Sequence, residues 1–373
     1  VTGVQTCALP ISLIEQMKEL ILHCDVKEND KLFYFTSTGW MMWNWLVAGL
    51  ACKASIYLYD GSPFYKNNDC LIKYCEDHQF TLFGVAAKYI DQLKKERFDA
   101  KKYNLKNLKT ITSTGSPLVK ESFIYVYEKI KKDVHLGSIS GGTDVVGVIN
   151  ICNPFNSIYA GEIQSPSLGI DVDVFDENGN STKIGEKGEL VIKKPFPSMP
   201  VMFWNDKTED KILNAYFRKY KNIWHHGDYI QKTKNGGYII YGRSDATLKP
   251  GGVRIGTSEI YRQVESFDEI KESIVIGQNY KNDVRIILFV KLSNQAKLTD
   301  ELIDKIKKKI RINCSPRHVP SKIISCPDIP RTKSNKIVEI SVRKIINGEK
   351  VDNIEALANP NSLEFFRQLK IDD

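Results

Sequence analysis

The chain has 373 residues, a formal net charge of +8, and apolar and charged fractions of 42% and 26%. This length allows two or more domains with separate cores, and the composition excludes fibrous and disordered classes. The modest positive charge is compatible with polyanionic ligands such as nucleotides, nucleic acid or acidic membranes, but it does not choose among them.

The first eleven residues, VTGVQTCALPI, lack the charged start and long apolar core of a secretion signal. They resemble the in-frame translation of a sequencing-library adapter. We therefore expect residues 1–11 to be a non-native segment and the natural sequence to begin at about Ser12.

From residue 12 to 243, short apolar runs alternate with amphipathic stretches, which predicts part of a large α/β domain with a mainly parallel sheet. The expected strands are KLFYFTS (31–37), ASIYLYD (54–60), TLFGVAA (81–87) and LKTITSTG (108–115). The stretch GWMMWNWLVAGLAC (39–52) is too short for a membrane span and contains Asn44, so it predicts a buried core helix and no membrane association.

After about residue 160, β-rich runs are broken by turn residues such as Asn178-Gly179. This texture predicts a β-rich subdomain of the large domain, with a hairpin at 233–243. Past Arg243 a different pattern predicts a small, mobile α+β C-terminal domain over 246–373. Its expected strands are 272–278 and 285–292, and its expected helix is about 299–312.

Cysteine spacing and basic runs exclude two further classes of site. Eight cysteines are scattered without a Cys-x-x-Cys pair or a histidine at ligand spacing, which argues against a zinc site or disulfide framework and favours a reducing cytoplasm. The basic runs 94–109 and 305–314 lack the aromatic platform of a nucleic-acid module. We expect no nucleic-acid partner, and the sequence does not indicate an oligomeric state.

The loop SISGGTD (138–144) is the first of three glycine-bearing candidates for a nucleotide site. Gly141 and Gly142 allow the backbone to approach a ligand, Thr143 offers a hydroxyl to a phosphate, and Asp144 offers a hard oxygen to Mg²⁺. A simple Gly-Gly turn is the alternative.

The second candidate, WHHGDY (224–229), places Asp228 after a glycine, where its two oxygens can accept hydrogen bonds from both ribose hydroxyls. A turn aspartate without a ligand is the alternative. Adjacent side chains on an extended backbone point in different directions, so we expect His225 and His226 to be structural.

The third candidate, YGRSDATLKPGGVRIGTSEIY (241–261), crosses the expected domain boundary near Asp245. Arg243 and Arg254 flank the Gly251-Gly252 turn and could grip a ribose and a phosphate while the linker rotates. Solvated linker charges are the alternative.

Six segments, taken in order, resemble the motif series of the adenylate-forming acyl-CoA synthetases: STGWMMWNW, STGSPL, SISGGTD, WHHGDY, GRSDATLKPGGVRIGTSEI and PRTKSNK. The resemblance runs from about residue 30 to the C-terminus and is strongest to the branch that acts on acetoacetate. It implies that acetoacetate attacks the α-phosphate of ATP, with Mg²⁺, to give an acyl-adenylate and pyrophosphate, and that the thiol of coenzyme A (CoA) then displaces AMP.

The resemblance also implies roles for individual residues. Adenine would be lined by Gly115, Ser116 and Pro117, ribose bound by Asp228 and Arg243, phosphate contacted by Gly142, Thr143 and Arg254, and Mg²⁺ held by Asp144. Many members of this superfamily have glutamate in place of Asp144, so the carboxylate here has a shorter reach.

The acid would occupy a pocket beside Gly141, since acetyl-CoA synthetases carry a tryptophan at this place. The glycine would leave room for acetoacetate, with Trp40 and Met41 as the opposite wall. The alternative is that Gly141 serves only the turn.

For the second step, the family rotates its C-terminal domain about a hinge, which the resemblance places at Asp245. Gly251 and Gly252 would then lie beside the pantetheine arm of CoA, and Arg311 would meet its 3′-phosphate. The alternative for Arg311 is one more charge on a basic helix.

In PRTKSNK the resemblance identifies Lys336, and not Arg331 or Lys333, as the catalytic lysine, with Thr143 as the other catalytic residue. An inserted ammonium stabilises the approach of two anions selectively in the transition state. Asn335 stands where most relatives have glycine, and asparagine tolerates a left-handed backbone.

The family's glycine- and serine/threonine-rich phosphate loop has no counterpart in the chain, and no G-x-x-x-x-G-K-[ST] motif occurs. We therefore expect a fragment that lacks a large upstream part and has weak or no activity. Two alternatives remain open: a non-catalytic nucleotide-binding module, and a short-chain acyl-CoA synthetase acting on propionate or butyrate.

Overall fold

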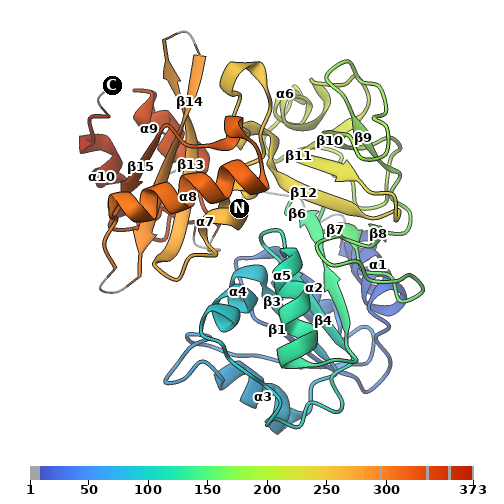
Figure 1. Ribbon diagram of the computed structural model, residues 1–373. Helices are drawn as coiled ribbons and strands as arrows, with labels where there is room; N and C mark the ends of the chain where they lie inside the picture. Colours follow the sequence, from blue (N-terminus) through green and yellow to red (C-terminus); the bar gives the residue numbers. More distant parts are fainter. Residues whose placement is uncertain (1–8, 282, 294–295, 333–335, 352–353, 372–373) are drawn as a thin grey trace. The chain divides into compact units, whose positions relative to one another are not determined.

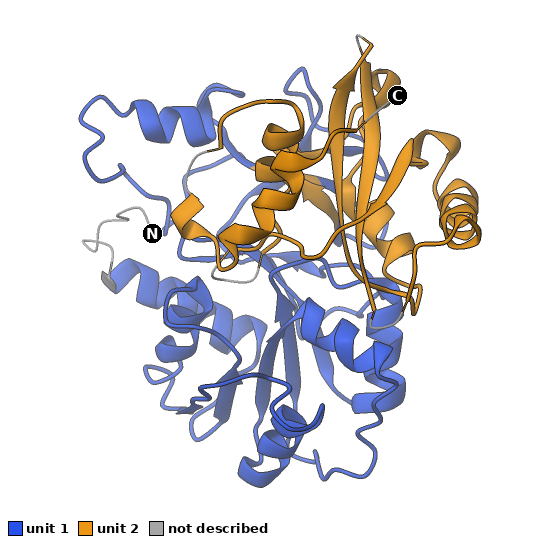
Figure 2. Ribbon diagram, turned by 90° about the vertical axis from the view of Figure 1, so that its left-hand side faces the viewer, with its two compact units in different colours: residues 1–226, 230–239 blue, residues 227–229, 240–373 orange. Residues whose placement is uncertain are grey.

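A computed structural model of the chain describes residues 9–281, 283–293, 296–332, 336–351 and 354–371 (Figure 1). It divides into two compact units (Figure 2). The first comprises Val1–His226 and Ile230–Ile239, and the second Gly227–Tyr229 and Ile240–Asp373. Residues 1–8 of the segment expected to be non-native lie outside the described residues, and residues 9–11 belong to the first helix.

The first unit is built on a parallel five-stranded sheet with the order β2-β1-β3-β4-β5. Its strands are β1 (Lys31–Tyr34), β2 (Ser55–Tyr57), β3 (Leu82–Ala86), β4 (Thr110–Thr114) and β5 (His135–Ser138). The first four residues of β3 and of β4 are buried, because strands covered on both faces require side chains that can be removed from water on both. The four strands and the α/β class expected from the sequence are confirmed.

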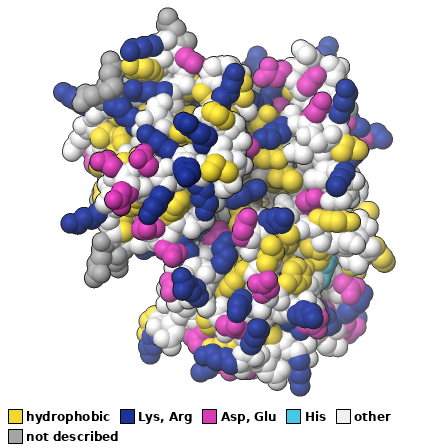
Figure 3. All heavy atoms as spheres, viewed as in Figure 1, with side chains coloured by type: hydrophobic (Ala, Val, Ile, Leu, Met, Phe, Trp, Pro, Cys, Tyr) yellow, Lys and Arg dark blue, Asp and Glu magenta, His cyan; other side chains and the backbone are white. Residues whose placement is uncertain are grey.

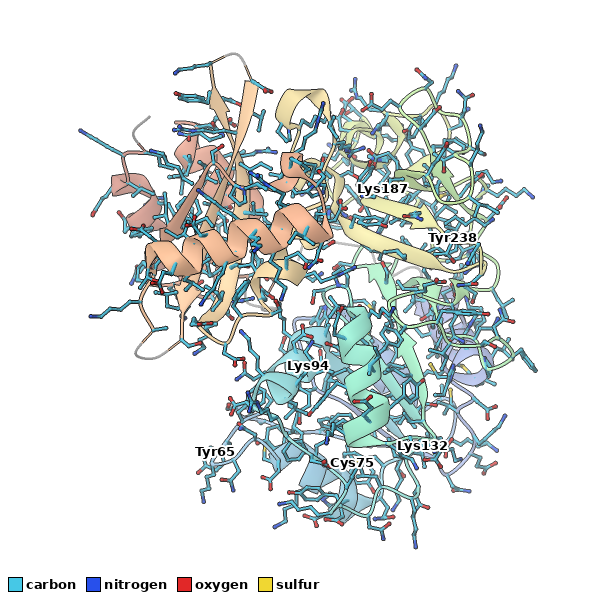
Figure 4. All side chains as sticks on the ribbon, viewed as in Figure 1. Tyr65, Cys75, Lys94, Lys132, Lys187 and Tyr238 are labelled. Carbon is cyan, nitrogen blue, oxygen red and sulfur yellow. The ribbon has the colours of Figure 1, made fainter. Side chains whose placement is uncertain are left out.

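Helices cover both faces of this sheet. On one face, α3 (Cys70–His78), α4 (Ala87–Lys95), α5 (Lys120–Tyr125) and η3 (Val126–Ile130) pack around Phe33, Phe80 and Phe123. Lys94 at the end of α4 donates a hydrogen bond to Ser122 of α5 at 2.8 Å (Figure 4). On the other face, α1 (Leu9–Lys18), the π-helical turn η2 (Glu19–His23) and α2 (Met41–Ala48) pack around Leu20, Met42 and Trp45. The core helix expected within 39–52 is therefore confirmed.

Two antiparallel sheets follow the parallel one. The smaller contains β6 (Ser140–Gly142), β7 (Gly147–Ile151) and β8 (Ser165–Pro166). The larger has the order β12-β11-β10-β9, with β9 (Val172–Phe175), β10 (Lys187–Ile192), β11 (Trp224–Lys232) and β12 (Tyr238–Arg243). Before β11 lie α6 (Asp210–Ile212) and η4 (Leu213–Phe217). The hairpin expected at 233–243 is found as the turn from β11 to β12, in which Tyr238 is buried (Figure 4).

The second unit is a three-stranded sheet between two helical layers. In β13 (Ile270–Tyr280), β14 (Asp283–Leu292) and β15 (Lys322–Ser325), the first pair is antiparallel and the second parallel. One face carries α7 (Thr257–Val264) and α8 (Asp300–Asn313), and the other carries α9 (Glu339–Ile346) and α10 (Leu363–Gln368). The Thr299 hydroxyl accepts from the Leu302 amide and begins α8, as an N-cap does. The strands and the helix expected in this part are confirmed.

The surface carries both signs of charge. In Figure 3, basic and acidic side chains are interspersed over the face in view instead of forming a single basic stripe. Within the described part of the chain, no helix is both long and apolar enough to cross a bilayer.

Candidate functional site

Two of the selected loops of the first unit leave neighbouring strands at the same edge of the parallel sheet. The loop that begins with Gly115 follows β4, and the loop that leads to β6 follows β5. The Thr114 hydroxyl donates to the Ile139 carbonyl at 2.8 Å and joins the two strand ends. The carboxyl edge of a parallel sheet is where open α/β folds place ligands.

Gly115 and Trp40 lie next to each other at this edge. Gly115 has a φ of +87°, which favours glycine, and a Cβ built on it would lie 3.7 Å from two atoms of the Trp40 indole. Trp40 is half-buried, whereas Met41 is only 9% exposed and packs in the core. Of the two residues expected to form a pocket wall, only Trp40 presents substantial surface.

Gly141 is a glycine because the neighbouring strand leaves no space for a side chain. It pairs with Val148 across the β6–β7 hairpin, and a Cβ built on it would lie 2.1 Å from the Gly147 carbonyl oxygen. Its φ is not positive. This contact explains the glycine without a ligand and favours the alternative that Gly141 serves the turn.

The rest of this turn is surrounded by aromatic side chains from a distant part of the chain. A Cβ on Gly142 would lie 2.8 Å from His226 Cε1, and the half-buried Asp144 accepts a hydrogen bond from the Tyr216 hydroxyl. Tyr216 stacks on Trp224 with ring centroids 3.6 Å apart. Trp224 Nε1 in turn donates to His226 Nδ1 at 3.3 Å. These rings hold the turn, while Thr143 at its tip is exposed.

Sequence reasoning did not find Tyr216 or Trp224, because LNAYFRKYKNIW (213–224) contains no motif and only its density of aromatic residues is unusual. The two histidines point to different partners, as expected. His225 Nε2 lies 2.9 Å from the Glu189 carboxylate, away from the turn that His226 contacts.

In the second unit the structure brings Asp228 and Arg243 together. The guanidinium donates to Asp228 Oδ1 at 3.2 Å, and the Asp228 side chain is largely buried. Gly227 has a φ of +84°, and a Cβ there would lie 2.7 Å from an Arg243 nitrogen. The glycine therefore gives the guanidinium its place beside the carboxylate.

Lys336 lies within electrostatic reach of this pair. Its residue is exposed, yet desolvation by the surrounding protein lowers the pKa of its ammonium group. The Asp228 carboxylate raises this pKa, and the Arg243 guanidinium lowers it further. The Lys336 amide donates to the Thr332 hydroxyl at 3.0 Å.

The other residues of PRTKSNK differ from Lys336. Arg331 pairs with Glu272 at 2.6 Å, which gives it a structural role. Lys333 and Asn335, and with them the expected left-handed turn, lie outside the described residues.

Arg254 and Asp245 belong to the linker that was expected to act as a hinge. Arg254 donates to the Thr247 hydroxyl at 3.0 Å and to the Ser244 carbonyl at 3.1 Å, and its guanidinium lies 4.3 Å from the centre of the Tyr229 ring. Arg343 of α9 donates to the Asp245 carbonyl at 2.6 Å. These contacts fix Arg254 to the linker.

The glycine turn of the second unit is exposed. Gly251 and Gly252 have φ values of +56° and +75°, and the Gly251 amide donates to both oxygens of Asp283 at 3.0 Å. The nearest atom to a Cβ on Gly251 is an Arg317 nitrogen at 3.7 Å. Arg311 is exposed in the last turn of α8.

A metal ion would have few protein ligands here. Among the residues that the structure describes, no group of three or more His, Cys, Asp or Glu side chains could hold one. Asp144 with Thr143 beside it fits Mg²⁺ only in the manner of nucleotide sites, where one or two carboxylates and the substrate phosphates share the ion.

The chain matches a known family and curated relatives. A family model described as AMP-binding enzyme matches residues 8–200. The chain is 52% identical over 373 residues to acetoacetyl-coenzyme A synthetase of Rhizobium meliloti (strain 1021), covering 99% of this chain and 57% of that protein. It is 42% identical over 374 residues to acetoacetyl-CoA synthetase of Gallus gallus, covering 99% of this chain and 56% of that protein.

Solved structures share the fold. Acetoacetyl-CoA synthetase from Streptomyces lividans superposes with a TM-score of 0.89 at 40% identity, covering 95% of this chain and 55% of that one. An anthranilate CoA ligase in complex with anthranoyl-AMP has a TM-score of 0.77 at 18% identity, covering 90% and 63%, which shows the fold alone. The chain thus spans little more than half the length of the curated relatives that it matches.

Proposed function

Because this chain belongs to the AMP-binding enzyme family, we propose that it contributes to an AMP-forming acid–thiol ligase that joins acetoacetate to CoA at the expense of ATP. The observation that carries the proposal is the identity to acetoacetyl-coenzyme A synthetases over nearly the whole chain.

The proposed reaction has two steps. A carboxylate oxygen of acetoacetate attacks the α-phosphorus of ATP, and the bond from that phosphorus to the pyrophosphate oxygen breaks. The sulfur of the CoA thiolate then attacks the carbonyl carbon of the adenylate, and AMP leaves with the electron pair of the broken bond. Both steps bring anions together, so the protein must supply positive charge and hydrogen-bond donors.

The nucleotide roles proposed for the first unit fall on the carboxyl edge of its sheet. Gly115, Ser116 and Pro117 would line the adenine, and Gly142 with the exposed Thr143 hydroxyl would contact the phosphates. Asp144 would hold Mg²⁺, which supplies positive charge to the phosphates when bound. The bond from Tyr216 supports this role, because it involves Oδ2 and orients the carboxylate.

For the second unit, we assign the ribose to Asp228 and Arg243, whose direct contact supports a shared role. Arg254 would contact the AMP phosphate. Because it donates two hydrogen bonds to the linker, its guanidinium would move together with the linker. Lys336 would stabilise the approach of the acid to the α-phosphate.

The CoA step is assigned to the exposed part of the same unit. Asp245 would be the hinge, and the Gly251-Gly252 turn would lie beside the pantetheine arm, with Arg311 at the 3′-phosphate. The open space at both glycines is consistent with a passing ligand. For the acid we propose Trp40 as the main wall, since Met41 is buried and Gly141 already has a packing role.

The test is pyrophosphate release with ATP, Mg²⁺ and a panel of acetoacetate, acetate, propionate and butyrate. We expect acetoacetate to be preferred. Propionate or butyrate at equal or higher rates would favour the short-chain alternative. AMP binding without pyrophosphate release would favour the non-catalytic module.

Lys336→Ala sharpens this test. Removing a transition-state charge costs on the order of a hundred-fold or more in rate, so adenylate formation should fall by that factor. Thioester formation from preformed acetoacetyl-adenylate should be largely retained. Lys305→Ala, on an exposed position of α8, is the matched control. Equal loss of both half-reactions would contradict the role of Lys336.

A further inference from the structure

Glu19 is a buried carboxyl group that the proposed reaction does not use. It is the first residue of the π-helical turn η2 and has no exposed surface. Burial raises its pKa to about 8, although the Val148 amide and Lys18 oppose the shift. A buried carboxyl group is costly unless its hydrogen bonds compensate, so its contacts require an explanation.

The two oxygens of Glu19 bind two different elements. Oε1 accepts a hydrogen bond from the Val148 amide at 2.7 Å, and Oε2 accepts one from Trp45 Nε1 at 2.9 Å. Val148 belongs to β7, and Trp45 belongs to α2. One carboxyl group therefore joins the β6–β7 hairpin to the core helix beside it.

This contact reaches the hairpin at a point where strand pairing is irregular. Val148 pairs with Gly141 next to a register shift, and β8 pairs with β7 only at Asn150 and Ile151. A Cβ on Gly147 would lie 3.0 Å from Glu19 Oε1, so the carboxyl also rests against the residue whose carbonyl excludes a side chain at Gly141.

Among the described residues, α1 supplies the charged neighbours that act on Glu19. From α1, Glu15 and Lys18 form an ion pair at 2.5 Å, and Lys18 also donates to the Ser167 hydroxyl and the Leu168 carbonyl just after β8. The Cys24 thiol is a further titratable group on which Glu19 acts electrostatically, and the buried His23 belongs to the same turn. From α2 and β7 the neighbours are the Trp45 indole and the Val148 amide, which are not titratable.

We propose that Glu19 is a positioning residue that holds the start of α2, with Trp40, in a fixed relation to the turn that carries Gly141, Gly142 and Thr143. In the proposed function both elements line the region that binds the acid and the phosphates, so an effect of Glu19 on catalysis rests on that proposed function. The carboxyl group is chemically required, because the amide nitrogen of a glutamine cannot accept a hydrogen bond and would leave one donor without a partner.

The first test needs no activity. In Glu19→Met, which keeps the length of the side chain and removes both acceptor oxygens, amide hydrogen exchange in peptides covering 140–151 should rise at least tenfold, with β3 and β4 unchanged. In the wild type, tryptophan fluorescence should change with a midpoint near pH 8, because Trp45 is bonded to the titrating group, whose pKa is about 8. That transition should vanish in Glu19→Gln and persist in Glu121→Gln, an exposed control on α5.

Trp45→Phe is the second variant, because it removes one donor while keeping an aromatic ring in the core. It should abolish the fluorescence transition and leave exchange at 140–151 within about twofold of the wild type, since the Val148 bond remains. Uniformly faster exchange across the first unit in Glu19→Met, or no change at 140–151, would overturn the proposal.

The second test applies to protein that releases pyrophosphate. Glu19→Gln should raise KM for acetoacetate and reduce the preference for acetoacetate over acetate, each at least tenfold, with KM for ATP within twofold. Unchanged selectivity in active protein would overturn the positioning role. An inactive wild type would instead count against the proposed function, and the exchange measurement would still decide the role of Glu19.

Discussion

The turns at Gly141 and Gly251 contain glycine for opposite reasons. At Gly141 the backbone conformation suits any residue, but a Cβ would lie 2.1 Å from a neighbouring carbonyl oxygen. At Gly251 the space is open, but the φ of +56° disfavours other residues. The same two-glycine pattern therefore marks a crowded turn in one unit and a left-handed turn in the other.

The two turns are held in place by different contacts. The first is fixed by side chains from other elements, with Tyr216, His226 and Glu19 around it. The second is exposed and tied to the sheet by the bonds from the Gly251 amide to Asp283. A turn held from several sides suits a fixed phosphate or acyl contact, and an exposed turn suits a segment that meets its ligand only in one step.

Gly141→Ala should have the largest effect on stability. The added methyl group meets backbone and not a flexible side chain, so the hairpin must shift, at a cost of about 3 kcal/mol in the free energy of unfolding. Urea denaturation measures it. Gly39→Ala, where nothing lies within 4 Å of the new atom, is the control. Equal stability of the two variants would contradict the crowding explanation.

Glu19 predicts a pH dependence that only the crowded turn should show. Its pKa is about 8 in the folded protein and near 4.5 when exposed, so its contribution to stability is complete below about pH 4.5 and is lost as the pH rises through 8. Each pKa unit corresponds to about 1.4 kcal/mol, and after relaxation we expect Glu19→Gln to gain about 2 kcal/mol relative to the wild type between pH 5 and 9. Urea denaturation at several pH values tests this. A constant difference would show that Glu19 does not titrate in this range.

Gly251→Ala should lower the free energy of unfolding of the second unit by about 1 kcal/mol, because alanine disfavours the left-handed conformation although its methyl group meets no clash. Gly251→Asn should cost less, because asparagine tolerates this conformation. Hydrogen exchange of β13 and β14 measures the stability of the second unit. A loss as large as that at Gly141 would remove the distinction between the two turns.

The smallest effects concern Lys336. Asp228 raises its pKa and Arg243 lowers it, so Asp228→Asn should lower that pKa and Arg243→Gln should raise it. At fixed pH, an amine-reactive reagent should label Lys336 faster in the first variant and slower in the second, each within about threefold for partly screened charges. Labelling of Lys305 should not change. If both variants changed the labelling rate of Lys336 in the same direction, the opposing effects of Asp228 and Arg243 on its pKa would be contradicted.

Much of the fold could be predicted because the type of each secondary-structure element depends on the pattern of residues close together in the sequence. The strands at 31–37 and 81–87 were recognisable as short apolar runs, and the helix at 299–312 by its charged, amphipathic pattern. Asp228 and Arg243 were expected to act together, and the structure places them in contact through a tight hairpin.

The α/β order of elements and the candidate turns could be predicted from the sequence, and the proposal of Lys336 instead of Arg331 came from the family resemblance. The side chains that surround those turns come from distant parts of the chain and depend on the tertiary fold. The Tyr216–Asp144 bond joins residues 72 positions apart, and the Glu19–Val148 bond joins residues 129 apart. Local spacing encodes backbone conformation, whereas such partners are chosen by the packing of whole elements against one another, which no short window of sequence contains.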